Sequence, residues 1–315
     1  MENALKIAAN ESQKIQLHFL IAMTMRNNAG DWETRDRVDD EFAEALKGGR
    51  QSEWYDDALF HYAEWVNNYG ALRQLEDGQW RQETDYSKAL ELYRRLLREF
   101  KKGETRYYDQ AQQQIKNITE ASLSVGVSNI FLPDSEVQFS LVARNVNQVN
   151  FALYKIDLTR DLRFTKNADQ EEGEGDAGAA AWIQNLAARE RDVVKRWKKD
   201  LPEKGEHRPF NEMLRIEGKL PVGAYLLEAR SGQLSARDLV LVTDASLVLK
   251  TTAKQAVVYF ANAISGAPIA NALVAVWESY YLNGKWYWRK LTQNTNSDGL
   301  ASFALKDDNN SRSLF

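Results

Sequence analysis

The chain has 315 residues, of which 43% are hydrophobic and 27% charged, and its formal net charge is −4. This length suits two or three domains. The small negative charge argues against a dedicated nucleic-acid binder, which needs a basic excess to displace counterions from phosphates. No cysteine is present, so disulfides, zinc–thiolate sites, cysteine nucleophiles and thioesters are excluded within these residues.

The N-terminal residues carry no export signal and no membrane span. Met1–Ala4 has no basic region leading into an apolar stretch. The most apolar early stretch, Phe19–Met23, is far too short to cross a bilayer. Two interpretations stay open: a cytosolic protein, or a chain from which an export signal has been removed.

Residues 1–120 show the 3.6-residue period of helices. The clearest apolar stripes comprise Tyr55, Leu59, Tyr62, Val66 and Tyr69, and then Tyr86, Ala89, Leu90, Tyr93, Leu96, Leu97 and Phe100. Gly70 fits the C-terminus of the first of these helices, and Asp85 offers an N-cap for the second. A further helix is expected around Tyr107–Ile118. Helices joined by short polar turns predict stacked pairs, so we expect a helical-repeat domain over residues 1–120.

After Glu120 the period changes to two, which is typical of half-buried antiparallel strands. The alternating apolar residues are Val137, Phe139 and Leu141, then Val149, Phe151 and Leu153. Strands resume at 223–229 and 238–243, so we expect a β-sandwich over residues 121–243 with a charged, helical insertion at 163–215. Within it, Glu171–Asp176 predicts a mobile acidic loop without the ordered spacing of a calcium loop. Ala179–Lys199 predicts a helix.

A second antiparallel sandwich is expected over residues 244–315. Asn283-Gly284 is the favoured pair for a two-residue type I′ turn. This turn predicts a hairpin in which Tyr281 faces Trp286, Tyr280 faces Tyr287 and Glu278 faces Arg289. Only five or six strands can be counted, whereas a sandwich usually has about seven. The second module is therefore expected to be incomplete. The predicted class is α+β multidomain, with helices first and two antiparallel β-sandwiches after them.

The hairpin register places four aromatic residues, Trp277, Tyr281, Trp286 and Trp288, on one face. They are the candidate partner surface. Two interpretations stay open: the four residues cover the sandwich core or an interdomain contact, or they form an exposed contact patch.

No catalytic constellation is found in the sequence. The three histidines, His18, His61 and His207, form no His-x-x-x-His pair, and neither a nucleophile elbow nor a phosphate loop is present. We therefore expect no catalytic residues, no cofactor and no metal site, and a protein that is not an enzyme.

Three groups of motifs resemble known families. Residues 85–93 (DYSKALELY) resemble the second helix of a tetratricopeptide unit. Residues 265–274 (SGAPIANALV) with 294–303 (NTNSDGLASF) resemble the signature of macroglobulin-like sandwiches. Residues 131–157 and 220–229 (LPVGAYLLEA) resemble the first macroglobulin domain of bacterial alpha-2-macroglobulins. The resemblance covers residues 121–315.

The resemblance implies a large secreted or periplasmic protease trap, in which a bait segment is cut and the protein closes on the protease. Neither a bait segment nor a thioester cysteine lies in this chain, which would be the N-terminal scaffold. Implied partners are target proteases, through the full-length protein, and a protein partner at the helical repeat. Nucleic acid is not expected, and a membrane only through an anchor outside the chain. The alternative is a non-inhibitory cell-envelope adaptor that holds protein or glycan partners.

Overall fold

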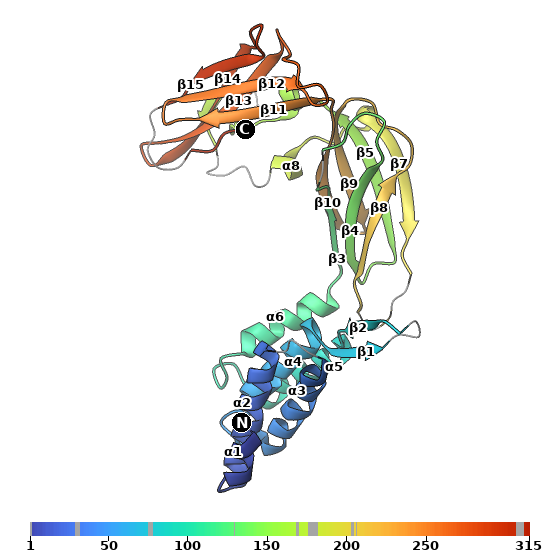
Figure 1. Ribbon diagram of the computed structural model, residues 1–315, viewed down its shortest axis with the longest axis vertical. Helices are drawn as coiled ribbons and strands as arrows, with labels where there is room; N and C mark the ends of the chain where they lie inside the picture. Colours follow the sequence, from blue (N-terminus) through green and yellow to red (C-terminus); the bar gives the residue numbers. More distant parts are fainter. Residues whose placement is uncertain are drawn as a thin grey trace. The chain divides into compact units, whose positions relative to one another are not determined.

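The computed structural model consists of helices followed by antiparallel sheets, so the predicted α+β class is confirmed (Figure 1). The chain forms two compact units, Met1–Ala121 with Pro202–Pro209, and Ser122–Leu201 with Phe210–Phe315. The structure describes residues 2–28, 32–74, 78–128, 130–167, 170–175, 182–202, 205, 207–306 and 312–315.

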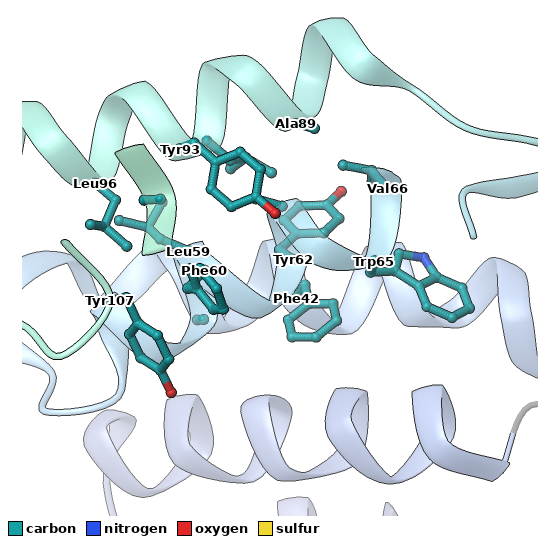
Figure 2. Close-up of a cluster of buried hydrophobic side chains, with 14 of the residues drawn as sticks. Phe42, Leu59, Phe60, Tyr62, Trp65, Val66, Ala89, Tyr93, Leu96 and Tyr107 are labelled. Carbon is teal, nitrogen blue, oxygen red and sulfur yellow. The ribbon is translucent and has the colours of Figure 1, made fainter. Parts of the chain in front are cut away.

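The first unit is built from helices, and α2 to α6 each bury apolar side chains in one core. Its helices are α1 (Glu2–Ile7), α2 (Glu11–Asn28), α3 (Trp32–Ala45), the 3-10 turn η1 (Leu46–Gln51), α4 (Tyr55–Asn68), α5 (Tyr86–Glu99) and α6 (Tyr108–Thr119). Most residues of the predicted stripes lie in the core, with Leu59 and Tyr93 fully buried, but Tyr69 is 45% exposed. Figure 2 shows Tyr62 of α4 beside Phe42 of α3, with ring centroids 5.3 Å apart. Tyr93 of α5 meets Phe60 of α4, with ring centroids 5.8 Å apart. No helix among the described residues is long and apolar enough to cross a membrane.

The predicted C-terminus of α4 and N-terminus of α5 are confirmed, but the segment between them is not a simple turn. Gly70, with φ of +61°, follows α4, and the Asp85 carboxylate accepts the backbone N–H of Lys88 at 2.8 Å. Between them β1 (Ala71–Gln74) and β2 (Trp80–Glu83) form an antiparallel hairpin. The expectation of helices alone up to residue 120 is wrong here. The helical period stops at Gly70 and does not resume before Asp85, which leaves room for two strands of four residues.

The second unit begins with two antiparallel sheets around one core. One sheet has the order β3-β4-β8, and the other β10-β9-β5-β7. The strands are β3 (Ser122–Gly126), β4 (Val137–Arg144), β5 (Gln148–Ile156), β7 (Val193–Asp200), β8 (Phe210–Ile216), β9 (Gly223–Ser231) and β10 (Leu234–Val242). The alternating residues predicted from the sequence, including Phe139 and Phe151, point into this core and are almost fully buried.

The predicted helix over Ala179–Lys199 is wrong. Among the described residues of that range, Trp182–Asn185 form the short helix α8, and Val193–Asp200 are the edge strand β7. Trp197 stacks on Phe151 of the neighbouring strand, with ring centroids 5.1 Å apart. Lysine side chains can cover apolar surface with their stems while their ammonium groups stay in water, so a strand rich in lysine can have a half-buried face. The segment 163–215, predicted to be a charged, helical insertion, also contains nearly all of the strand β8, which was not predicted from the sequence.

The predicted mobile loop at Glu171–Asp176 is also wrong, because Glu172–Glu174 form the strand β6. Asp176 lies outside the described residues. β6 pairs with β14 (Lys285–Asn294), so the connection between β5 and β7 adds a strand to the next group of sheets.

The second group of sheets in this unit consists of β11-β12-β15 and β13-β14-β6. Its remaining strands are β11 (Ala245–Thr251), β12 (Gln255–Asn262), β13 (Leu273–Leu282) and β15 (Leu300–Ala304). The predicted hairpin is confirmed in every pair: Tyr281 faces Trp286, Tyr280 faces Tyr287 and Glu278 faces Arg289. Asn283 and Gly284, with φ of +50° and +81°, make the turn. The domain boundary at residues 243 and 244, and the incompleteness of the second sandwich, stay predictions.

Replacing Asp85 by alanine should destabilise the helical unit by about 1 kcal/mol, because the first turn of α5 loses its side-chain cap. Urea unfolding followed by circular dichroism at 222 nm measures this change. Glu91→Ala is the control, since Glu91 is exposed in the middle of the same helix. Equal stability of Asp85→Ala and Glu91→Ala would show that the cap contributes nothing.

Candidate partner-binding surface

The four aromatic residues singled out from the sequence share one face of the β13–β14 hairpin, but their surroundings differ. Trp277 and Trp288 are 3% and 1% exposed, whereas Tyr281 is 52% exposed and Trp286 partly exposed. Tyr281 and Trp286 form an edge-to-face pair with ring centroids 5.4 Å apart. The set therefore splits into a buried pair and an accessible pair near the turn. Whether the accessible pair binds a partner stays a prediction.

The buried pair is covered by residues from distant parts of the chain. Phe164, from the connection between β5 and β7, stacks on Trp288 with ring centroids 4.3 Å apart and meets Trp277 edge-on at 5.6 Å. Phe315 lies 4.9 Å from Phe164, and Trp182 lies 6.3 Å from Phe315. Such pairs contribute about 0.5–1.5 kcal/mol each beyond the area that they bury. The sequence reading missed Phe164, since no local pattern joins it to residue 288.

Backbone contacts hold the same connection against β14. Gly175 donates its N–H to the Trp286 carbonyl at 3.0 Å, and Lys290 donates its N–H to the Glu171 carbonyl at 2.7 Å. Gly175 has no room for a side chain: a Cβ there would lie 2.2 Å from the Phe164 carbonyl oxygen and 2.6 Å from Trp288 Cδ1. Glycine is therefore required at this position by close approach.

The acidic side chains of β6 meet basic groups of the second sandwich. The Glu172 carboxylate accepts hydrogen bonds from Lys306 Nζ at 2.6 Å and from the Tyr280 hydroxyl at 2.5 Å. Glu174 accepts from Lys285 Nζ at 3.0 Å. The hydrogen bond from Lys306, with that from Tyr280, holds the pKa of Glu172 below its usual value. Burial lowers the pKa of Lys306, but its hydrogen bonds to Glu172 and Tyr280 outweigh this and raise the pKa.

The opposite face of the hairpin holds a buried carboxylate. Glu278 is fully buried and accepts hydrogen bonds from Arg289 Nε at 2.6 Å and from the Lys306 backbone N–H at 2.9 Å. Arg312 Nε forms an ion pair with it at 3.1 Å. A buried charge is tolerated only when its hydrogen-bonding capacity is met. The pairing of Glu278 with Arg289 follows from the predicted register, whereas Arg312 could not be assigned from spacing.

The histidines and acidic side chains of the described residues form no metal-binding cluster. No group of three or more histidine, cysteine or acidic side chains there could hold a metal ion. His18 contacts Glu41 at 2.7 Å, and His61 contacts Glu64 at 3.0 Å and the Tyr107 hydroxyl at 3.2 Å, all within the helical unit. The contact of His18 with Glu41 joins α2 and α3, whereas His61 and Glu64 lie on the same helix, α4. The absence of enzymatic activity stays a prediction.

A hollow of about 400 Å³ lies where β5 ends and β7 begins. Lys155, Arg160 and Arg191 line it together with Asp157 and Asp192, so charges of both signs are mixed. The Asp157 carboxylate already accepts the N–H groups of Thr159 and Arg160. Three basic side chains are therefore offset by two acidic ones, and the hollow has no strong charge of one sign that would select a ligand.

No protein-family model and no curated protein matches the chain. Similar solved structures include native alpha-2-macroglobulin from Escherichia coli spanning domains MG0-NIE-MG1, with 14% identity and a TM-score of 0.38 over 61% of this chain and 63% of that one. Salmonella alpha-2-macroglobulin reacted with methylamine has 14% identity and a TM-score of 0.25 over 62% and 15%. Red sea bream transglutaminase has 9% identity and a TM-score of 0.25 over 78% and 36%. The matched part is less than two thirds of each of these structures, and likeness at this level carries no argument about function.

Because the aromatic residues divide into a buried pair and an accessible pair, replacing one of each by alanine should lower the stability of the second unit by different amounts. Trp288→Ala should destabilise the second unit by about 3–5 kcal/mol, because it leaves a cavity under Phe164. Tyr281→Ala should cost about 1 kcal/mol or less, because half of that side chain already meets water. Urea unfolding followed by tryptophan fluorescence compares the two. Similar losses would contradict the division into buried and accessible pairs.

The contacts of Glu172 predict a pH dependence. A carboxyl group with a lowered pKa in the folded state stabilises the fold above its ordinary pKa of 4.5, and this contribution is lost as the pH falls through the lowered value. Lys306, with a raised pKa, contributes below 10.5 and loses its contribution above it. Glu172→Gln should therefore be less stable than the parent by about 1 kcal/mol or less at pH 7, and this deficit should shrink as the pH falls below 4.5.

Urea unfolding at a series of pH values measures this difference. Glu212→Gln is the control, because Glu212 is exposed on β8. If the deficit of Glu172→Gln were the same at pH 3 and pH 7, the carboxylate would not act through its charge.

Proposed function

We propose that this chain is the N-terminal scaffold portion of a bacterial alpha-2-macroglobulin-like protease inhibitor, with the bait segment and any thioester outside these residues. What supports the proposal is that the separate parts of each macroglobulin-like motif, which lie far apart in the sequence, come together in the fold. Residues 131–157 and 220–229 supply β5 and β9, which pair side by side, Phe151 with Ala229 and Leu153 with Leu227.

The two halves of the motif of residues 265–274 and 294–303 also come together, although the β13–β14 hairpin separates them in the sequence. Thr295 is 5% exposed, and its hydroxyl donates to the Ile269 carbonyl at 2.7 Å and accepts the Ala272 N–H at 2.9 Å. Gly299, from the second half, accepts the Phe260 N–H at 2.8 Å through its carbonyl. The two halves thus form one corner of the sandwich. This gives a physical reason for their occurrence together.

A trap that closes on a protease needs a stationary base from which later domains move. The pairing of β6 with β14 and the stack of Phe164 on Trp288 join two consecutive groups of sheets by more than the covalent chain. While β6 stays paired with β14, these contacts hold the two groups of sheets together. In this proposal the chain has no catalysis of its own and acts in the periplasm or outside the cell. It reaches target proteases through the rest of the protein, and the helical repeat is available to a protein partner.

The alternative is a non-inhibitory adaptor of the cell envelope. The accessible Tyr281 and Trp286 favour it, since aromatic residues with a polar tip suit protein or glycan contacts. Soluble glycans and candidate partner proteins titrated against Tyr281→Ala and the parent chain distinguish this role, because only an adaptor should lose binding.

The isolated chain should neither hydrolyse a protein substrate nor inhibit a protease at equimolar concentration, because cleavage of the bait drives trapping. The full-length protein should protect a large protein substrate from a protease while leaving a small peptide substrate accessible. Parallel assays of both preparations with both substrates test this. Stoichiometric inhibition by the isolated chain, or no protection by the full-length protein, would contradict the proposed function.

A further inference from the structure

We propose that the edge of β14 is a strand-acceptor site for an acidic extended segment of a partner protein, and that Glu171–Gly175 of this chain is its resident, displaceable ligand. This inference goes beyond the proposed function and does not rest on it.

The backbone geometry at this edge is that of strand addition. Glu174, Gly173 and Glu172 stand opposite Tyr287, Trp288 and Arg289 in an antiparallel ladder. Main-chain hydrogen bonds of this kind supply affinity, whereas side chains supply selectivity. β6 belongs to the connection between β5 and β7 and adds to a sheet formed more than 100 residues later in the chain.

The side chains at the edge select for negative charge. Lys290 lies 3.7 Å from Glu171, Lys306 2.6 Å from Glu172, and Lys285 3.0 Å from Glu174. Three ammonium groups thus meet three carboxylates along one short strand. A neutral or basic strand in the same place would leave these lysines without their partners.

Two further features define the ligand. Gly175 must lack a Cβ because of its close approach to Trp288, and Phe164 anchors the segment by stacking on the same indole. An extended segment that carries acids, a glycine and an aromatic anchor therefore fits the site. Binding through an aromatic anchor with a polar surrounding is the usual arrangement at protein interfaces.

The site is longer than its resident ligand. β14 runs over ten residues, Lys285–Asn294, but β6 faces only three of them. Near Gln170 the segment turns away, since the Gln170 N–H donates to the Asn167 carbonyl at 3.0 Å. Among the described residues, the ladder along this edge of β14 does not continue over Leu291–Asn294. A longer acidic strand could pair there as well, which gives a partner an advantage over the resident segment.

A synthetic peptide with the sequence of residues 163–176 tests the proposal. It should bind a loosened variant, Phe164→Ala with Glu174→Lys, about tenfold or more tightly than it binds the parent chain, whose site is filled. A peptide in which Glu171, Glu172, Glu174 and Asp176 are changed to lysine, with Asp169 kept, should bind the loosened variant about tenfold or more weakly. Fluorescence anisotropy of the labelled peptides gives both ratios, and Glu212→Lys is the control for a charge change elsewhere.

Near-ultraviolet circular dichroism checks that the loosened variant is folded. If it is not, Gly175→Ala replaces it, because the added Cβ displaces the resident strand and leaves every lysine of the acceptor edge in place. A folded variant that binds neither peptide, or that binds both equally, would overturn the proposal. Equal binding of the acidic peptide to the parent and to the variant would show that the resident segment does not occupy the site.

Discussion

The contact of Phe164 with Trp288 is the constraint on which the aromatic face of the second sandwich depends. Trp288 is 1% exposed because Phe164 lies flat on it, and Gly175 is required because the same indole leaves no space for a Cβ. With Phe164 in place, β6 lies along β14, and Glu171, Glu172 and Glu174 meet three lysines. Apolar contact, close backbone approach and charge therefore act on one short segment.

Much of this fold could be predicted from local patterns. The 3.6-residue stripes of α4 and α5 identify the faces that pack together, because a stripe on one side of a helix can only be buried against a neighbour. Asn283-Gly284 fixes the register of β13 and β14, because its turn geometry matches the twist of the strands. That register placed Trp277, Tyr281, Trp286 and Trp288 on one face, although it could not tell which of them would be covered.

The segments that could not be predicted are those whose conformation is decided elsewhere in the chain. β6 is acidic and glycine-rich, with almost no apolar surface, and it is a strand because lysines and an open sheet edge lie beside it. β7 is rich in lysine and arginine, and it is a strand because Trp197 stacks on Phe151 while the lysine stems cover the sheet. Edge strands often carry charge because it prevents pairing with other molecules, and this weakens their local signal.

The most direct test of the account is a disulfide across the β6–β14 pair, in a chain that has no cysteine of its own. Glu174 and Tyr287 are register partners, and opposed Cα atoms in such a ladder lie about 4.5–5.5 Å apart, within the reach of a disulfide. Glu174→Cys with Tyr287→Cys should close an intramolecular disulfide under mild oxidation. Glu174→Cys with Lys290→Cys, displaced by about 10 Å along the strand, should not. Closure of both pairs to the same extent, or of neither, would contradict the account.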